Sequence, residues 1–501
     1  MTLDLGSGPA GPWLRGALAQ PAEAPDDARP AAPAKAAEAE PASGRPAKAG
    51  KAARPARRPA KAKAPAPTPA TPATPAPTSA EVPVDPYASP ELGDASKVIV
   101  PPRLGLGDVA AMQGLLAVQR LDGWLLQDRA GSNPVALRLL ALASRPEKPW
   151  VYLLPVSGEP SVVCHDSDAA AFDKVAAKRV IYRSDREREQ ALRALLKGKK
   201  SVALELLGGG PRVAGGGKAV VQVPAELRAV FRALRIAAVS SDHLVQYTSA
   251  VWGEPGYLAH HVAAHHLMEL RKEALAYVAA QVRAGVTVTD YEVQQRLLRN
   301  MTMRGVVGPD PSVASGVNTA TPAYQPTSKT ATPIRVGDLL LLQLAVKVDR
   351  PDGVFAAQTW VAFVGETVPE RVSSLFAAVA GARDQAVALM AERNRRRQPL
   401  RGHEVDAAAR ALLGKAHPAD RFAHALGHSI DTSLDGAGAD LDGFAAKDQR
   451  SLVAGTGVTV GPGLYFTGDL GLCSEVTVFL SPSGPQVTTA AQSAVQALLA
   501  P

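Results

Sequence analysis

Four histidines stand close together near the middle of the chain, at a spacing that could serve a metal ion. His260, His261, His265 and His266 lie in the segment EPGYLAHHVAAHHLMELRKEALAYVAAQVRAG, whose pattern predicts a long helix ending at Gly285. His261 and His265 are four residues apart and therefore share a helix face. The helix offers no obvious carboxylate or thiolate as a third ligand at matching spacing. We therefore interpret these histidines as exposed or capping residues.

A second group of chemistry-bearing residues lies further along the chain, within four strings. These are VGDLLLLQLAVKVDRPDGVFAAQTWVAFVG, FAHALGHSIDTSLDGAG, VTVGPGLYF and GLCSEVTVF, at residues 336–365, 422–438, 458–466 and 471–479. In this order they resemble the motifs of the creatinase/Xaa-Pro aminopeptidase family of "pita-bread" metallopeptidases. The family's strings read GDxxLxDxxA…aDiTWv…G, GHSIG, HGxG, VEPGIY and GVRSEV. The resemblance covers about residues 100–490 and implies an α/β (α+β) fold.

The resemblance also implies which positions once held metal. The family binds two metal ions through two strand aspartates, one histidine and two glutamates, and the ions activate a shared water. The five matching positions are Gln343, Gln358, His428, Gly461 and Glu475. Only His428 and Glu475 keep the family's residue type, so we expect no metal cofactor. The family's two carbonyl-positioning histidines match Ala323 and Asp435, so we expect no catalytic residue there.

Two interpretations of this remnant pocket remain open. The amide oxygens of Gln343 and Gln358, together with His428 and Glu475, would suffice for one weakly bound divalent ion. Asp431 and Asp435 are nearby in sequence. The other interpretation is a metal-free polar pocket in which His428 and Glu475 form hydrogen bonds with the two glutamines.

The pattern of retained and lost residues bears on function. The strand alternation and the glycines at tight turns survive, whereas most ligands are replaced. This selective loss predicts a folded, catalytically inactive Xaa-Pro aminopeptidase-like pseudoenzyme that acts as a binding or scaffold protein, with a peptide or protein ligand in the old cleft. The alternative is an active hydrolase with a rearranged site, either of Xaa-Pro aminopeptidase/prolidase type or a metal-independent creatinase-like enzyme.

The first part of the chain differs sharply in composition. Residues 1–95 are rich in Ala, Pro and Lys and hold almost no large apolar side chain, so we expect a disordered tail. Its basic tract comprises Arg45, Lys48, Lys51, Arg54, Arg57, Arg58, Lys61 and Lys63. The tract matches the whole chain's net charge of +8, which leaves a near-neutral body. It could contact nucleic acid or an acidic partner without sequence preference, or act as a plain tether.

The remaining chain divides into two expected domains. Residues 96–245 alternate helical and strand patterns and resemble the creatinase N-terminal domain, which implies a homodimer through that domain. Residues 246–501 are the pita-bread domain. The start has no secretory pattern and the longest apolar run is too short for a bilayer, so we expect a cytoplasmic protein without membrane contact. Cys164 and Cys473 are too few for a disulfide framework.

Overall fold

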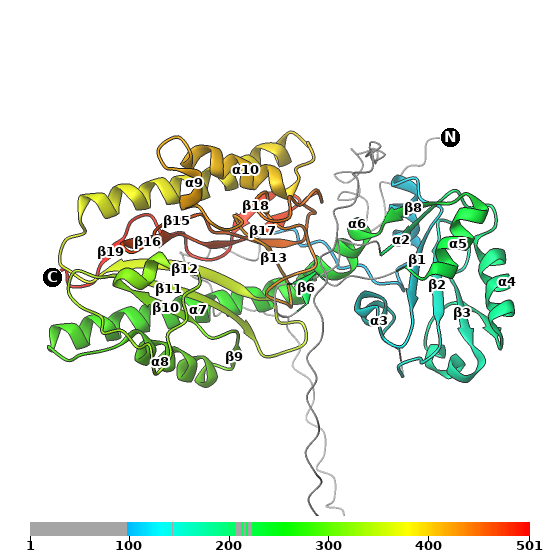
Figure 1. The fold of residues 1–501 in the computed structure, drawn as a ribbon, viewed down its shortest axis with the longest axis horizontal. Helices are drawn as coiled ribbons and strands as arrows, with labels where there is room; N and C mark the ends of the chain where they lie inside the picture. The colour runs from blue at the N-terminus through cyan, green and yellow to red at the C-terminus, as the bar shows by residue number, and fades with distance from the viewer. Residues whose placement is uncertain (1–97, 143, 206–211, 214–216, 219–222) are drawn as a thin grey trace, which may run out of the picture. The chain divides into compact units, whose positions relative to one another are not determined.

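The protein is described by a computed structural model covering residues 98–501, apart from residues 143, 206–211, 214–216 and 219–222. The tail predicted for residues 1–95, with its basic tract, lies outside the described residues. The described chain has the mixed α/β architecture that the sequence predicts (Figure 1).

A mixed sheet organises the first part of the described chain, in the strand order β4-β3-β2-β1-β5-β8. Its strands are β1 (Gly123–Asp128), β2 (Trp150–Pro155), β3 (Ser161–His165), β4 (Lys178–Tyr182), β5 (Ser201–Leu204) and β8 (Ala237–Ser240). The strings GWLLQD and SVAL form β1 and β5, in agreement with the alternating helical and strand patterns expected for residues 96–245. β2 pairs antiparallel with both β1 and β3, whereas the β1–β5, β3–β4 and β5–β8 pairs are parallel, so β2 runs against the other five strands.

Helices and short segments accompany this sheet. They are α2 (Val109–Val118), α3 (Pro134–Leu140), η2 (Asp166–Phe172), α4 (Asp185–Leu196), the two-residue strands β6 (Arg212–Val213) and β7 (Gly217–Lys218), and α5 (Ala225–Leu234). Side chains from the sheet and these helices form two buried clusters, one around Trp124 and one around Leu125. Neighbouring residues of β1 thus serve opposite faces, as strand alternation requires.

A helical stretch leads into the second part of the chain. It consists of α6 (Asp242–Val245), the π-helical turn η3 (Gln246–Ala250), α7 (Gly253–Arg283) and α8 (Asp290–Met303). α7 is the long helix predicted from the sequence. Thr289 caps the start of α8, because the Thr289 hydroxyl accepts the Glu292 amide at 3.2 Å while the Glu292 carboxylate accepts the Thr289 amide at 2.8 Å.

Strands of the second part form three hydrogen-bonded groups. One has the order β10-β11-β12-β19, with β9 also paired to β11; the others are β13-β14-β17-β18 and β15-β16. The bounds of the first group are β9 (Val306–Val307), β10 (Ser312–Ser315), β11 (Leu339–Val348), β12 (Ala356–Phe363) and β19 (Gln496–Ala497). Those of the others are β13 (Ser429–Ile430), β14 (Gly457–Val460), β15 (Gly463–Phe466), β16 (Leu470–Cys473), β17 (Val476–Ser481) and β18 (Gly484–Val487).

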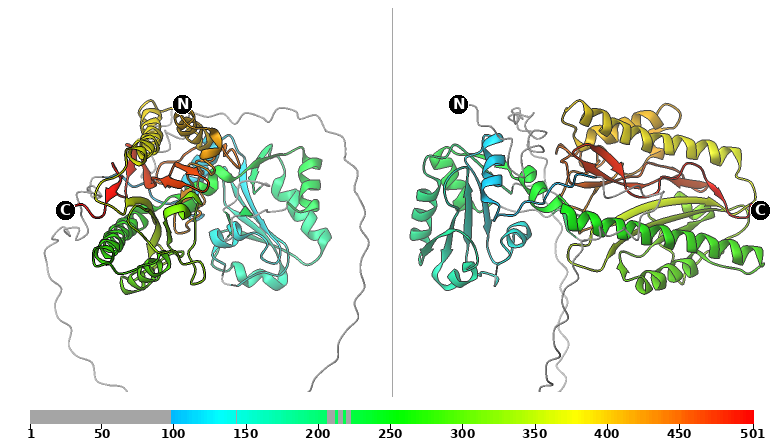
Figure 2. Two further views of the ribbon diagram at one scale, coloured as in Figure 1. Left: turned by 60° about the vertical axis from the view of Figure 1, so that its left-hand side comes forward. Right: turned by 180° about the vertical axis from the view of Figure 1, so that it is seen from behind.

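Helices lie on both sides of these strands. The remaining elements are η4 (Gly316–Ala320), α9 (Glu370–Arg395), α10 (Gly402–Leu413) and η5 (Ala419–Arg421). Figures 1 and 2 show α7 and α8 on one side and α9 and α10 on the other, with the strands between them. Even-numbered β11 residues such as Leu342 pack with α7 and α8, whereas odd-numbered ones such as Leu341 pack with α9 and α10.

The histidines of α7 are placed differently from the expectation. His260 is fully buried and His261 is 7% exposed, so the prediction of exposed or capping residues is wrong for these two. His260 Nδ1 lies 2.8 Å from the Phe355 carbonyl oxygen, and its Nε2 lies 2.7 Å from the Thr488 hydroxyl. Burial lowers the pKa of His260 to about 3, so the ring is neutral at ordinary pH. It joins α7 to the strands as a core residue.

Among the described residues, no helix combines the length and the apolar character that crossing a membrane requires.

Candidate functional site

The β11–β12 hairpin decides which side chains reach the former metal pocket. Gln343 lies opposite Thr359 in the antiparallel register, so both side chains emerge on the same face of the sheet. On this face the Thr359 hydroxyl donates to Glu475 Oε2 at 2.8 Å, and the Thr359 amide donates to the Glu475 carbonyl at 3.3 Å. Thr359 and Glu475 are 1% and 8% exposed. The retained glutamate is therefore buried against β12, where the Thr359 hydroxyl donates a hydrogen bond to its carboxylate.

Gln358 lies on the opposite face, and this corrects the sequence assignment. Its Oε1 accepts a hydrogen bond from Arg271 of α7 at 3.0 Å, and its amide nitrogen donates to the Ala490 carbonyl. The Arg271 guanidinium also stacks over Trp360, 3.7 Å from the ring centre. Gln358 belongs to the interface between α7 and the sheet, so the expectation that it faces His428 and Glu475 is wrong.

The correct match for the second family aspartate is Ala357. The family string aDiTWv places its aspartate two residues before the threonine, and Thr359 is followed here by Trp360. Ala357 is in turn two residues before Thr359, so it shares the face of Gln343. Its methyl group can bind no cation, whereas a glutamine at this place would have offered an amide oxygen. The pocket therefore lacks one more oxygen atom that could bind a metal ion.

The two former glutamate positions do lie side by side. An ideal Cβ placed on Gly461 would be 2.9 Å from Glu475 Cβ, which is closer than real Cβ atoms approach a neighbour. Cys473 and Gly461 also adjoin, because the thiol sulfur lies 3.8 Å from the Gly461 carbonyl oxygen. The absence of a side chain at position 461 thus leaves Glu475 the space that it now fills.

His428 lies beside Thr459 of β14 and near Asp435. The His428 amide donates to the Thr459 hydroxyl at 3.1 Å, and its carbonyl accepts the Thr459 amide at 2.9 Å. A side chain on Gly427 would overlap the Thr459 backbone, so glycine is needed for this close approach. His428 Nδ1 lies 3.9 Å from Asp435 Oδ1 and 3.1 Å from the Ser429 carbonyl oxygen. The imidazole thus has a carboxylate beside it where the family has a second histidine.

Asp431 is not a ligand candidate, because its carboxylate is buried and occupied. It accepts backbone amides from Ser433 at 2.7 Å and from Ala437 at 2.8 Å, which fixes the loop after β13. Ala323 is exposed, with φ of 52° in the loop after η4. Its methyl group cannot polarise a carbonyl or carry a proton.

Three residues beside Glu475 were missed by the sequence analysis. His424 Nε2 lies 3.3 Å from the Tyr465 hydroxyl, and the two rings meet edge to face at 5.5 Å. Tyr465 of β15 and Cys473 of β16 come together because these strands pair antiparallel. The one available signal was the spacing of His424, four residues before His428 in HALGH. We call His424, Tyr465, Cys473, Thr359 and Glu475 the Glu475 cluster.

Burial sets the protonation of the Glu475 cluster. It lowers the pKa of His424, an effect that the charge of Glu475 and the Ala425 carbonyl oppose. Burial and the charge of Glu475 raise the pKa of the Cys473 thiol to about 12. Burial also raises the pKa of Tyr465 well above its ordinary value. At neutral pH the thiol and phenol are therefore protonated, and the cluster offers neither a thiolate nucleophile nor a second anion.

The residues present do not fit the family's dinuclear centre. Two bridged dications need several carboxylates, and Glu475 is the one that remains among the five former ligand positions. Throughout the described ranges, no three His, Cys, Asp or Glu side chains are grouped so that they could hold a metal ion. Gln343 remains on the pocket face, where it contributes a neutral amide.

The described chain has the fold of the pita-bread metallopeptidases. Residues 264–482 match the model of metallopeptidase family M24. No curated protein sequence matches the chain.

Solved structures resemble the chain over most of its length. Dipeptidase PepE from Mycobacterium ulcerans is 20% identical, with a TM-score of 0.53; the match covers 78% of this chain and 97% of that one. The prolidase from Thermococcus sibiricus is 18% identical, covers 78% and 98%, and has a TM-score of 0.48. The Xaa-Pro dipeptidase from Bacillus anthracis is 17% identical, covers 78% and 99%, and has a TM-score of 0.47. The likeness to the first of these concerns the fold alone.

Proposed function

We propose that this protein is a catalytically inactive, Xaa-Pro aminopeptidase-like pseudoenzyme that uses the metallopeptidase fold for binding or as a scaffold. The observation that carries the proposal is the bond between Thr359 and Glu475 on the pocket face. A buried carboxylate that accepts a hydroxyl is satisfied without a cation. In a working dinuclear site the same oxygen would be a metal ligand.

Electrostatics support the same conclusion. Four ligand carboxylates of the family are reduced to Glu475, because the matching positions are Gln343, Ala357 and Gly461. Removing that negative charge from two adjacent dications weakens their binding severely, since carboxylate charge determines affinity for hard cations. Hydrolysis also needs a carbonyl-polarising group and a proton carrier, and Ala323 supplies neither.

The binding role includes three parts that we propose together. The former cleft accepts a peptide or protein ligand, the N-terminal domain forms a homodimer, and the basic tract of residues 45–63 contacts nucleic acid without sequence preference. The tract carries eight cationic and no acidic side chains, so counterion release would drive such contacts.

Metal content and turnover test the central proposal directly. We expect the purified protein to hold well under one divalent ion per chain, and to leave a Xaa-Pro dipeptide uncleaved after addition of Mn²⁺ or Co²⁺. Mn²⁺ should not raise its melting temperature, because a ligand stabilises a fold only when it binds the native state. Two stoichiometric ions per chain, or turnover above the buffer rate, would refute the pseudoenzyme.

A gain-of-ligand experiment tests the placement of the pocket. The variant Gln343→Asp/Ala357→Asp/Gly461→Glu restores three carboxylates on the face of Glu475, and we expect it to take up Mn²⁺. The matched control replaces Ala357→Asp with Gln358→Asp, whose carboxylate would face Arg271. The control should bind less Mn²⁺ and gain less thermal stability from it. Equal uptake by both variants would contradict the assignment of Ala357, and so would uptake by neither while both remain folded.

A further inference from the structure

The turn that joins α9 to α10 is strongly cationic. Both helices lie on the same side of the strands (Figure 1), and the residues that link them read ERNRRRQPLRGHE, from Glu392 to Glu404. Five arginines against two glutamates leave this segment with a net charge of +3. We call its arginines the α9–α10 arginine cluster: Arg393, Arg395, Arg396, Arg397 and Arg401.

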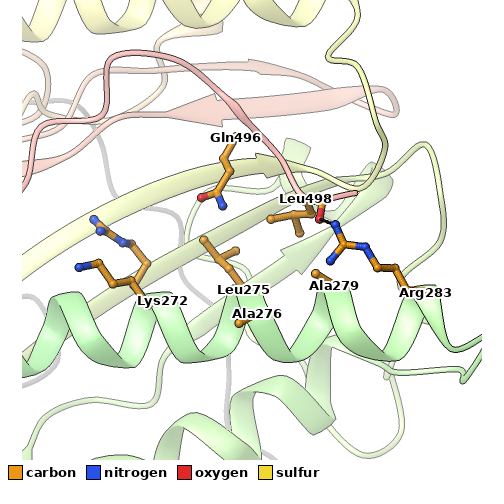
Figure 3. A pocket seen from close by; sticks show the side chains of 8 residues that line it. Lys272, Leu275, Ala276, Ala279, Arg283, Gln496 and Leu498 are labelled. Atoms are coloured by element: carbon orange, nitrogen blue, oxygen red, sulfur yellow. Dashed lines mark hydrogen bonds between the residues drawn. The ribbon is translucent and has the colours of Figure 1, made fainter. Parts of the chain in front are cut away.

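Other arginines of the second part of the chain hold the fold together. Arg283, at the end of α7, donates to the Leu498 carbonyl at 3.1 Å (Figure 3) and to the Ala500 carbonyl at 2.9 Å. Arg383, in the middle of α9, is 3% exposed and donates to the Ser474 hydroxyl at 2.6 Å. The guanidinium groups of these arginines are engaged by neighbouring segments, so they serve packing rather than a partner.

The α9–α10 arginine cluster is exposed, and its ion pairs can exchange for others. Arg395 and Arg396 share the Glu392 carboxylate, and their side chains are 74% and 61% exposed. Arg393 lies 3.6 Å from Glu404, with both side chains about a third exposed. Exposed ion pairs contribute little free energy, because water and salt screen them. A partner's carboxylates can therefore replace Glu392 at little cost.

Arg397 is exposed and occupies a position that favours glycine. Its φ of 54° is left-handed, and its amide donates to the Asn394 carbonyl at 2.9 Å, as in other helix ends of this type. Glycine takes the left-handed position after α7 and α8, at Gly285 and Gly305. No described residue forms an ion pair with the Arg397 guanidinium. The chain thus accepts backbone strain here and keeps an additional cation at the surface.

The make-up of the cluster favours carboxylates over the phosphates of a nucleic acid. Glu392 shows that these arginines hold a carboxylate, and with Glu404 it would repel a phosphate backbone. Arg393 and Arg397 are four residues apart, so they lie ~6 Å from each other along the helix axis, which suits carboxylates on neighbouring residues of a peptide. The segment 392–404 contains no Phe, Tyr or Trp that could stack on bases.

We propose that the α9–α10 arginine cluster docks a short acidic segment of a partner protein. Carboxylates of this segment pair with Arg397 and displace Glu392 from Arg395 and Arg396, through charge-assisted hydrogen bonds. Complementary charge governs specificity and association rate more than affinity, so we expect a contact of moderate strength that weakens as salt is raised. This surface is separate from the Glu475 cluster, and the proposal holds whether or not the former pocket binds a metal ion.

The test measures binding of a fluorescent octapeptide of Asp and Glu to the full chain by anisotropy, with an Asn and Gln octapeptide as the uncharged control. The variant Arg395→Gln/Arg396→Gln/Arg397→Gln should weaken the acidic peptide about tenfold. The matched control Arg54→Gln/Arg57→Gln/Arg58→Gln removes the same charge from the basic tract of residues 45–63, and should change the affinity less than about twofold. Equal losses in the two variants would overturn the proposal, because net charge alone would then explain the binding.

Two substitutions of Arg397 separate binding from folding. Arg397→Gly relieves the left-handed backbone, so the melting temperature should stay or rise while the affinity for the acidic peptide falls several-fold. Arg397→Lys keeps the charge and should bind within about twofold of the native chain. Unchanged peptide binding by Arg397→Gly would overturn the proposal. An equal loss of a single-stranded DNA oligonucleotide in the triple variant of the cluster would do so too, because it would make this surface a nucleic-acid site.

Discussion

Thr359→Val removes the hydroxyl that satisfies Glu475, and its cost can be worked from the geometry. The two side chains are almost wholly buried and their oxygens are 2.8 Å apart. Valine keeps the volume of threonine, so the change leaves a buried carboxylate that has lost its donor. A hydrogen bond to a charged group contributes roughly 1.5–3 kcal/mol, and we expect the free energy of unfolding to fall by about that amount.

A double-mutant cycle separates this bond from other effects. Glu475→Leu should also destabilise the fold, because it leaves the Thr359 hydroxyl buried without its acceptor. The double variant replaces both partners with apolar groups and should cost less than the sum of the two, with a coupling energy of about 1–2 kcal/mol.

Urea unfolding followed by circular dichroism measures each corner of the cycle. Thr302→Val serves as the matched control, because this exposed threonine donates to the neutral Leu298 carbonyl on α8; its effect should stay within about 0.5 kcal/mol. Additive costs in the cycle, or a neutral Thr359→Val, would refute the view that this hydroxyl has taken over the role of a cation.

Three further predictions concern pH and the tail. Burial raises the pKa of Glu205 from 4.5 to about 7, so its contribution to stability is full below pH 4.5 and is lost as pH rises through about 7; Glu205→Gln should abolish this loss of about 3 kcal/mol in pH-dependent unfolding. Burial lowers the pKa of His260 from 6.5 to about 3, so its contribution is present above pH 6.5 and falls by about 3 kcal/mol by pH 4.5; His260→Gln should flatten this acid branch, and an unchanged slope would contradict the burial argument. A chain beginning at Ser96 should keep its melting temperature and lose the low-salt gel retardation of DNA expected of the full chain; equal retardation by both would reject the 45–63 tract as the contact.

Local sequence patterns predict many of the helices and strands of this fold. The long apolar periodicity of α7, the cap at Thr289 and the alternation in β1 and β11 are short-range signals, and each corresponds to an element of the structure. The ordered strings between residues 336 and 479 also indicated the family, because their glycines and strand residues report the scaffold rather than the chemistry.

The assignment of Gln358 shows where local pattern failed. A shift of one residue moves a strand side chain from one face of the sheet to the other, and the sequence match placed the second aspartate on Gln358, one residue away from Ala357. The register of β12 against β11 and the Arg271 bond that holds Gln358 against α7 exposed this error, and the spacing of aDiTWv before Thr359 also points to Ala357. The prediction that the α7 histidines are exposed was wrong for a related reason. His260 is buried by contacts with Phe355 and Thr488, which are distant from it in sequence.

The sequence by itself determined the class of fold and the loss of most ligand carboxylates, because both depend on residue identity at positions that motifs locate. Tertiary structure alone decided what surrounds Glu475. The Glu475 cluster joins Thr359 of β12 to His424, Tyr465 and Cys473, which come from a loop and from two other strands. Contacts between segments far apart in sequence, and the burial that sets their charge, exist only once the layers have packed together.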